Sequence, residues 1–243
     1  MKRLRRRKPS LGARLKAGSL VLAVLAALAA YGGYRLAEWP GFRLSRVVVS
    51  GNVRVPSEQI VAAAAVPDDR NLWFVRLAAA QRRVAAIPWI ATARLVRVPP
   101  STLRIEVTER TPVATVPAGA AEGTPGYALV DATGRVLERD ERPRWRQPLV
   151  LGASRTSGDF PRIVADLKTL ADAGVRVREL DVTPLGELVA VTYSKLRLDF
   201  GDDADLTRKA SLVNPIIARL GRRVSGVAAL DLRAPRTPVV VYR

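Results

Sequence analysis

The stretch IATARLVRVPPSTLRIEVT, residues 90–108, carries two strand signals on either side of a turn. Residues 90–98 are rich in apolar and β-branched side chains, and a Pro-Pro-Ser run at 99–101 interrupts them. From Leu103 onward, apolar side chains alternate with polar ones, which is the period of a strand with one buried and one hydrated face. The stretch therefore predicts two consecutive strands joined by a turn.

The segments before this stretch predict one further strand and two helices. Residues 44–50 are rich in β-branched side chains and end at Gly51-Asn52, a turn signal. A helix is expected from Pro56 to about residue 65, with Ser57 or its neighbour as the cap. A second helix is expected over residues 74–86, where apolar side chains form one stripe. The element order is β-α-α-β-β, and we place this domain at residues 42–111.

The N-terminal segment predicts one membrane span. The first 16 residues carry eight Lys and Arg and no acid, and residues 17–34 carry no charge. At about 1.5 Å per residue, these uncharged residues cover roughly 27 Å as a helix, close to a hydrocarbon core of about 30 Å. Basic flanks stay in the cytoplasm. We therefore expect residues 1–16 to be a cytoplasmic tail, residues 17–37 a transmembrane helix, and the rest extracytoplasmic.

A cleaved signal peptide is the competing interpretation of this segment. Ala27-Leu28-Ala29 has the small-x-small pattern of a cleavage site. However, the apolar region is longer than the usual signal core of about 7–15 residues. The length favours a retained anchor in the inner membrane, crossed once, with the N-terminus in the cytoplasm.

The chain after Pro112 predicts a second domain, residues 112–243. A hairpin is expected over 127–137, and helices are expected at 160–173 and directly after Asp205. The remaining β-rich segments are expected as strands, and they are 175–182, 187–193, 196–200, 227–232 and 238–243. The predicted fold class is α+β: a single N-terminal transmembrane helix, the β-α-α-β-β domain, and a mixed α/β domain with a mainly antiparallel sheet.

The composition argues against an enzyme or a metalloprotein. The chain has no Cys and no His, so it lacks thiol nucleophiles, thiolate ligands and the commonest general base. Eight of the 40 basic residues lie beside the predicted span, where membrane topology explains them better than nucleic-acid binding does. We expect no catalytic residue, no cofactor, no metal, no small-molecule substrate and no nucleic acid.

Two charged clusters are candidate sites that we discount. Asp202-Asp203-x-Asp205 lacks the Gly and the distal Glu of a calcium-binding EF-hand loop, and a helix cap after a turn explains it. Glu109-Arg110, just past a strand, is a candidate ion pair between the two domains. An exposed pair of this kind contributes only about 0–1 kcal/mol.

The last six residues, Pro238 to Arg243, form a β-prone segment with three consecutive valines. A strand at a sheet edge has an unpaired row of N–H and C=O groups, and edges are usually protected by charges, Pro or bulges. Here only the two ends of the segment carry such protection. An open edge accepts a partner strand, whereas an interior strand would use its valines as core. From the residues alone, both positions remain open.

Six sequence blocks occur in one order and spacing along the chain. They are Val47-x-Val49-x-Gly51-Asn52, Pro88-Trp89-Ile90, Val96-Arg97-x-x-Pro100-x-Thr102-Leu103-x-Ile105-x-Val107-x-Glu109-Arg110-x-Pro112-Val113-Ala114, Leu129-Val130-Asp131-x-x-Gly134, Leu196-x-Leu198-x-x-Gly201 followed by Lys209, and Leu230-Asp231-Leu232-Arg233. Together they resemble the FtsQ/DivIB family of bacterial division proteins, in which a polypeptide-transport-associated (POTRA) domain precedes a larger β domain.

The resemblance implies a non-enzymatic divisome scaffold with one membrane span, which links early and late assembly at the septum. It implies binding of FtsB/FtsL-like partners, with a partner strand added to the last strand of the chain. The implied partner-binding residues are Arg233, Pro238, Val239, Val240, Val241 and Tyr242. Two departures concern this surface: Ala234 stands where the family often has an aromatic residue, and the sequence ends at Arg243.

Two other functions remain as alternatives. A membrane-anchored POTRA module could handle polypeptides in an export pathway, because a fold alone does not fix function. The Leu-Asp-Leu-Arg block at 230–233 and the missing membrane β-barrel argue against this. An envelope hydrolase is the third possibility, and the absence of His disfavours it.

Overall fold

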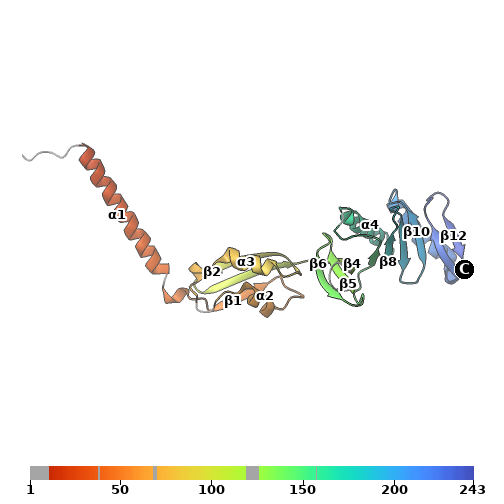
Figure 1. Ribbon diagram of the computed structural model, residues 1–243, viewed down its shortest axis with the longest axis horizontal. Coiled ribbons are helices and arrows are strands. Elements are labelled where there is room, and N and C mark those ends of the chain that lie inside the picture. Colours follow the sequence, from red (N-terminus) through yellow and green to blue (C-terminus); the bar gives the residue numbers. More distant parts are fainter. Residues whose placement is uncertain (1–10, 38, 68–69, 119–125, 157) are drawn as a thin grey trace, which may run out of the picture. The chain divides into compact units, whose positions relative to one another are not determined.

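The computed structural model of the chain describes residues 11–37, 39–67, 70–118, 126–156 and 158–243 (Figure 1). It divides the chain into two compact units, unit 1 (Met1–Glu109) and unit 2 (Arg110–Arg243). The loop predicted at 119–126 falls almost entirely outside the described residues.

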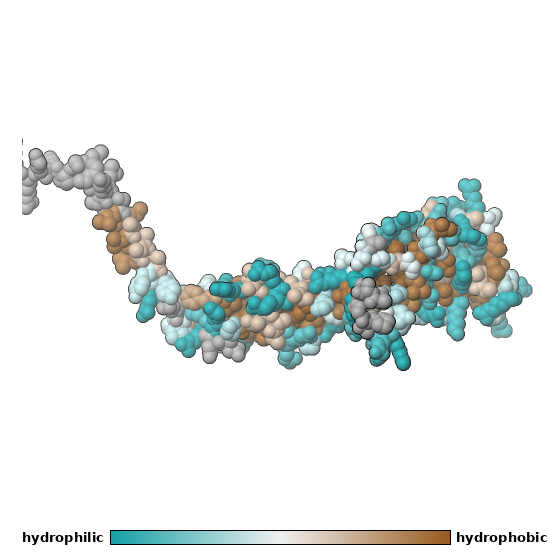
Figure 2. Space-filling view, viewed as in Figure 1, coloured by the Kyte–Doolittle hydropathy of each residue, from teal (hydrophilic) through white to brown (hydrophobic). Residues whose placement is uncertain are grey.

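The first helix, α1 (Leu11–Ala37), covers the segment in which the sequence predicts a membrane span. Within the described part of the chain, no helix combines the length and the apolar content that crossing a bilayer requires. The predicted tail, 1–16, and several positions of the predicted span, 17–37, have side chains outside the described residues. The spanning helix of the predicted fold class is therefore not confirmed. The described apolar side chains of α1, such as Leu22 and Leu28, are exposed (Figure 2).

Unit 1 contains the predicted β-α-α-β-β order. Its three strands are β1 (Arg46–Ser50), β2 (Ile90–Val98) and β3 (Thr102–Glu109), and its two further α-helices are α2 (Ser57–Ala64) and α3 (Leu77–Ala85). The sheet order is β1-β3-β2, with β3 parallel to β1 and antiparallel to β2. The apolar side chains of the alternating strand, Leu103, Ile105 and Val107, are all buried in the core of this unit. The prediction for residues 90–108 is thus confirmed in type and in spacing.

The helix starts of unit 1 match the prediction only in part. The N-cap residue of α2 is Pro56, the neighbour of Ser57, and it makes no side-chain cap bond, while the Ser57 hydroxyl accepts a hydrogen bond from Asn52 Nδ2 at 3.2 Å. The second helix begins at Leu77 rather than at residue 74, because residues before it form the 3₁₀ turn η2 (Leu72–Phe74). The Asn71 side chain caps this turn by accepting from Trp73 N at 3.0 Å, a cap that the sequence analysis missed.

Glu109, at the end of β3, fastens the β1–α2 loop of the same unit. Its carboxylate accepts hydrogen bonds of 2.9 Å from the backbone N–H groups of Val53, Arg54 and Val55. Burial raises the pKa of Glu109, and the three backbone donors outweigh burial, so the net pKa lies below its usual value. Of the two residues of the candidate ion pair, Glu109 thus binds backbone groups of unit 1, and Arg110 binds Asp131 in unit 2.

We predict that Glu109→Gln destabilises unit 1. The amide keeps one acceptor oxygen but loses the charge that strengthens three hydrogen bonds, so we expect a loss of about 1–3 kcal/mol. Because the folded pKa is lowered, the stabilisation is present above the unfolded pKa and is lost as pH falls through the folded one. Amide hydrogen exchange at Val53–Val55 measures the effect directly. The prediction is contradicted if the amide protection of the wild type stays constant as the pH falls from 6 to below about 4, which is near the pKa of a free Glu side chain.

Unit 2 is built on one nine-stranded sheet of order β12-β11-β10-β9-β8-β7-β4-β5-β6 (Figure 1). The strands are β4 (Pro112–Ala118), β5 (Gly126–Asp131), β6 (Val136–Asp140), β7 (Leu149–Leu151), β8 (Val177–Val182), β9 (Leu188–Thr192), β10 (Arg197–Gly201), β11 (Val227–Asp231) and β12 (Val239–Tyr242). The pairs β10–β11, β4–β7 and β7–β8 are parallel, and the other pairs are antiparallel. The mainly antiparallel mixed domain is confirmed, although β4 and β7 are additions to the predicted strands.

Two helices, α4 (Phe160–Asp172) and α5 (Leu206–Leu220), supply the other layer of the core. Fully buried side chains from helices and strands meet in one cluster, including Phe160, Leu170 and Phe200. Gly174 follows α4 with φ +76°, a left-handed conformation that ends a helix most readily with glycine. These helices lie where their apolar stripes predict them.

The acidic run after β10 is used for local contacts. Asp202 binds the ammonium group of the buried Lys209 at 2.8 Å, and Asp203 pairs with Arg162 of α4. Asp205 is the N-cap residue of α5, with a left-handed backbone and no side-chain cap bond. The cap expected of its side chain is therefore wrong, whereas the predicted start of the helix directly after it is right.

Candidate partner-binding edge

The last strand, β12, lies at one end of the nine-stranded sheet. It pairs antiparallel with β11 on one side, in the register Leu230↔Val240 and Asp231↔Val239. On its other side, no strand of the described chain is paired with it. In an antiparallel pair, alternate residues direct their N–H and C=O groups away from the neighbour. These groups of β12 form the open row that strand addition requires, and among the described strands β12 is an edge strand rather than an interior one.

The side chains of β12 leave an apolar surface beside this open row. Val239, Val241 and Tyr242 are 54%, 44% and 56% exposed, whereas Val240 is half-buried and packs against the core of unit 2. One side chain therefore fixes the strand to the domain, and three are available for contact. A partner strand would gain backbone hydrogen bonds from the edge and apolar contacts from these side chains.

The opposite edge of the sheet, strand β6, carries charged side chains that protect it against pairing with a foreign strand. Strand β6 has the sequence Val-Leu-Glu-Arg-Asp, so three of its five residues are charged. Charged side chains discourage pairing with a foreign strand. The four residues of β12 carry no charge, and the nearest residues that discourage strand pairing are Pro238 before the strand and Arg243 after it. Of the two edges of this sheet, β12 is the less protected.

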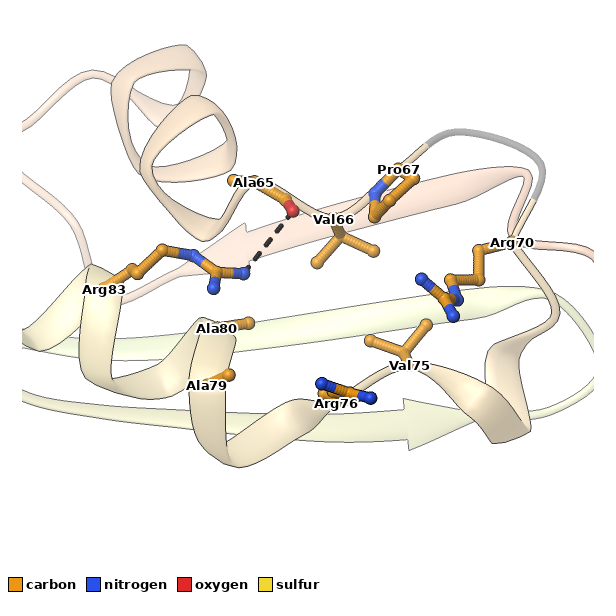
Figure 3. A pocket seen from close by; sticks show the side chains of 9 residues that line it. All are labelled: Ala65, Val66, Pro67, Arg70, Val75, Arg76, Ala79, Ala80 and Arg83. Atoms are coloured by element: carbon orange, nitrogen blue, oxygen red, sulfur yellow. Dashed lines mark hydrogen bonds between the residues drawn. The ribbon is translucent and has the colours of Figure 1, made fainter.

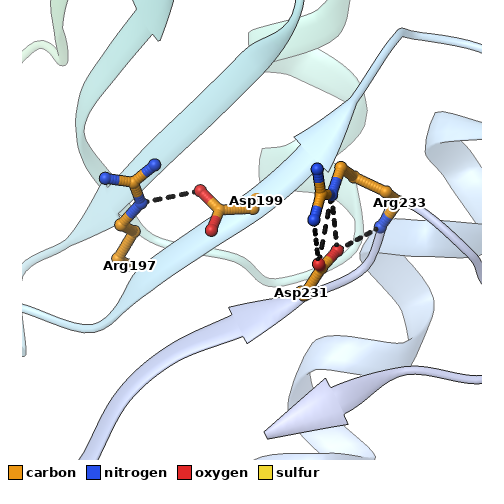
Figure 4. A network of polar contacts seen from close by, with 4 residues as sticks. All are labelled: Arg197, Asp199, Asp231 and Arg233. Carbon is orange, nitrogen blue, oxygen red and sulfur yellow. Dashed lines mark hydrogen bonds and ion pairs between the residues drawn. The ribbon is translucent and has the colours of Figure 1, made fainter. Parts of the chain in front are cut away.

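Arg233, a predicted partner-binding residue, is engaged within its own chain (Figure 4). Its guanidinium group contacts both carboxylate oxygens of Asp231, with Nη2 at 2.5 Å and Nε at 3.0 and 3.1 Å. The Arg233 hydrogen bond holds the pKa of Asp231 below its usual value. The side chain remains 63% exposed, so a partner carboxylate would compete with Asp231 for a cation that is already oriented.

The geometry beneath Arg233 depends on Gly201. A Cβ atom at this position, where φ is +67°, would lie 2.9 Å from Arg233 Cγ. The glycine therefore allows the arginine stem to lie across the end of β10. Next to it on β10, Asp199 binds Arg197 at 2.7 Å (Figure 4). The two Asp–Arg pairs lie on the neighbouring strands β10 and β11, where Asp199 is in register with Asp231. Asp231, Asp199 and Arg197 were not among the site residues predicted from the sequence.

The two ends of β12 are fixed by backbone bonds. A turn before Pro238 is closed by Thr237 N donating to Ala234 O at 3.0 Å, and Arg243 N donates to Gly226 O at 2.9 Å. Ala234 thus lies in the turn that connects the Arg233 pair to the edge strand. The structure brings the six predicted residues to one end of the sheet, with Arg233 on the β11 side and Pro238 to Tyr242 along the edge. Whether a partner binds them stays a prediction.

Comparison with known proteins supplies the family. Residues 42–110 match the model of the FtsQ-type POTRA domain, and residues 120–233 match the model of the C-terminal region of the cell division proteins FtsQ and DivIB. The two models follow each other in one chain. The chain belongs to the FtsQ/DivIB family of cell division proteins. The predicted family is confirmed, and so is the prediction of a family of division proteins rather than of enzymes.

Individual FtsQ proteins are similar over different lengths. The chain is 38% identical to the cell division protein FtsQ of Mycobacteroides abscessus over 117 residues, which is 48% of this chain and 36% of that protein. It is 33% identical to FtsQ of Syntrophotalea carbinolica over 180 residues, 73% of this chain and 60% of the relative. FtsQ of Novosphingobium aromaticivorans is 29% identical over 222 residues, 88% and 66% of the two chains. The matches therefore span about a third to two thirds of these relatives.

Proposed function

We propose that this FtsQ/DivIB-family chain is a non-enzymatic scaffold of the bacterial division machinery. Its working part is the exposed edge strand β12, which we assign to FtsB/FtsL-like division proteins as the place where a partner strand is added. The observation that carries this proposal is an unprotected apolar edge at the end of the sheet, with Val239, Val241 and Tyr242 exposed beside it. An exposed edge of this kind promotes aggregation unless a partner strand covers it.

The proposal includes attachment to the cytoplasmic membrane through α1. It rests on the basic N-terminal segment and the uncharged stretch after it, and on the exposed apolar side chains that α1 presents. The extracytoplasmic units would then be held near the bilayer and enriched at the division septum. A scaffold that links early and late division proteins needs both features, a fixed location and an exposed binding edge.

Localisation and partner capture together test this function. A fluorescent fusion of the full chain is expected to gather at midcell in dividing cells, and the tagged chain is expected to retain FtsB/FtsL-like proteins in a pull-down from solubilised membranes. Uniform envelope staining with no division protein retained would overturn the proposal. Retention of unfolded export substrates in the same pull-down would favour the POTRA export module instead.

A further inference from the structure

Unit 1 exposes a group of aromatic side chains that the proposed edge-strand function does not use. We call Trp39, Phe42, Trp73 and Phe74 the aromatic patch. Trp39, Trp73 and Phe74 are 58%, 45% and 42% exposed. Phe42 joins the two tryptophans edge to face, with ring centroids 5.8 Å from Trp39 and 6.0 Å from Trp73. A contiguous exposed patch of large rings marks an interaction surface more often than scattered apolar side chains do.

The patch is assembled from two segments that are distant in sequence. Trp39 is the N-cap residue of the 3₁₀ turn η1 (Pro40–Phe42) and Phe42 is its last residue, whereas Trp73 and Phe74 belong to η2. The segments are joined by an antiparallel bridge between Arg43 and Asn71 and by the bond from Leu44 N to Arg70 O at 2.9 Å. The rings are thus presented on one supported surface.

The η2 turn is anchored on both sides of its exposed rings. Leu72 and Val75 are buried, at 0% and 4% exposure, and they bracket Trp73 and Phe74. Arg97 of β2 donates hydrogen bonds of 2.8 Å to the carbonyl oxygens of both Leu72 and Val75. The core therefore holds the backbone while the two rings face outward. Exposing two aromatic rings to water is unfavourable in free energy, and burying them against a ligand surface would remove that cost.

A pocket of about 380 Å³ is lined by residues that precede η2 in sequence and by residues that follow it, and three of these residues are arginines (Figure 3). Val66, Val75 and Ala80 supply apolar lining. Arg83 reaches in from α3 and donates to the carbonyl oxygens of Ala64 and Ala65, at 2.6 and 3.4 Å from Nη2. The guanidinium group of Arg70 points toward it from the other side (Figure 3).

Arg70 and Arg76 keep their donors available. Among the described residues, neither side chain has a hydrogen-bond or ion-pair partner. Both line the pocket, and both are exposed at its margin. A guanidinium fork binds phosphate and carboxylate groups well, often through two parallel hydrogen bonds. The pocket margin thus has the chemistry of an anion site, one residue before Asn71 and one residue after Val75, directly beside the η2 rings.

We propose that the aromatic patch and the Arg70–Arg76 pair together dock on the surface of a phospholipid bilayer. Tryptophan and other aromatic rings favour the membrane–water interface, and basic side chains next to them meet lipid phosphates. The choice of a lipid surface rests on the charge of the pair, which complements phosphate, and on chain continuity: Trp39 comes two residues after the end of α1. The docking holds unit 1 against the bilayer, in addition to the α1 anchor of the proposed function on which it partly rests.

The experiment uses tryptophan fluorescence in the full chain, reconstituted in nanodiscs that contain phosphatidylglycerol. A variant that keeps only Trp73, with Trp39, Trp89 and Trp145 changed to Phe, is compared in ordinary lipid and in lipid brominated near the headgroup end of the acyl chain. Interfacial side chains lie about 5–10 Å into the boundary region, within reach of such bromines, so emission is expected to fall by about half or more.

Trp89 gives a matched control in the same unit. It precedes β2, whereas Arg97, which holds the η2 backbone, lies near the other end of that strand. Eight residues of extended strand separate the two positions by about 26 Å. Trp89 is also covered by the guanidinium group of Arg54, 4.5 Å from the ring. A variant that keeps only Trp89 is expected to show the same tryptophan emission in brominated lipid as in ordinary lipid.

The arginine pair is tested in the Trp73-only background. Arg70→Gln/Arg76→Gln is expected to abolish most of the quenching of Trp73, and Arg82→Gln, an exposed arginine of α3 outside the pocket lining, is expected to leave it unchanged. Because Asp68 and Asp69 precede Arg70 in the sequence, Asp68→Asn/Asp69→Asn is expected to preserve or increase the quenching. Equal quenching in the double arginine variant would overturn the phosphate contact.

A tryptophan introduced in α1, Leu25→Trp, separates failure of this inference from failure of the anchor. If deep bromines quench Leu25→Trp while Trp73 remains as bright as Trp89, the chain is attached and the docking surface is refuted. If neither position is quenched, the membrane attachment itself is refuted and the docking with it. Quenching of both Leu25→Trp and Trp73 supports the inference.

Discussion

Proline at one of two adjacent positions in β12 is expected to weaken partner binding without unfolding the domain. In an antiparallel ladder, one of Val240 and Val241 bonds to β11 and the other directs its N–H and C=O groups outward. Proline at the outward residue removes a donor that only a partner strand would use. Leaving the partner's carbonyl oxygen without its donor costs about 1–3 kcal/mol, which corresponds to roughly a 5- to 150-fold weaker complex.

The pair of variants controls for folding. Proline at the residue bonded to β11 breaks the internal ladder, so it should lower both binding and the free energy of unfolding. Proline at the outward residue should lower binding alone. Arg139→Pro at the β6 edge gives a matched change on the protected side of the sheet, and it should leave partner binding intact. Binding is measured by titrating the purified full chain with the partner captured in the pull-down.

One result would refute strand addition at β12. If both proline variants, and also Val241→Lys, retain full affinity in a folded domain, the partner does not use this edge. The family membership would be untouched by that outcome, because it rests on matches over residues 42–110 and 120–233. Partner binding would then have to be sought on another surface of unit 2.

Local periodicity was sufficient to predict most elements of this chain. The 90–98 strand has the predicted boundaries, and α4 begins at Phe160 as its apolar stripe indicates. Two strands of unit 2 lacked such a signal. Strand β4 contains Pro112 and Pro117, which disfavour strand assignment, and β7 is only three residues long. Strand β7 is held by parallel pairings with the distant strands β4 and β8, whereas β4 pairs antiparallel with β5 and parallel with β7. A single-sequence pattern does not carry the information on the parallel pairings.

The residues alone left the position of the last strand open between edge and interior, and the resemblance to the FtsQ/DivIB family favoured the edge. Strand β12 does lie at an edge of the sheet, but the charged contacts near it were not predicted. Arg233 binds Asp231, which is two residues earlier and is the last residue of β11. This short spacing is visible in the sequence, but it was not used to predict the contact. The partners of Glu109 were not readable, because the N–H groups it binds lie 54 to 56 residues away.

The last prediction concerns the buried carboxylate that organises the start of unit 2. Asp131 is 5% exposed and accepts hydrogen bonds from Thr133 N, Thr133 Oγ1 and Arg135 N at 2.8, 2.7 and 3.0 Å. Its other oxygen binds Arg110 Nη1 at 2.5 Å, and both side chains are largely buried. We expect Asp131→Ala to lower the free energy of unfolding by about 3–5 kcal/mol, because it removes the anion of a buried ion pair and leaves the Arg110 cation without that partner. Urea unfolding of the full chain, followed by circular dichroism, gives the value.

The same pair gives a pH signature and a coupling test. Burial raises the pKa of Asp131, and the bonds from Thr133, Arg110 and Arg135 outweigh burial, so the net pKa lies below its usual value. A lowered folded pKa means that this stabilisation is fully present above about pH 4 and declines as pH falls through the folded pKa. Asp131→Asn should flatten that decline. Arg110→Met and Asp131→Asn combined should cost less than the sum of the single changes, because each single change already breaks the pair. Strict additivity would show that the two side chains contribute independently and that the Arg110–Asp131 contact does not stabilise the domain.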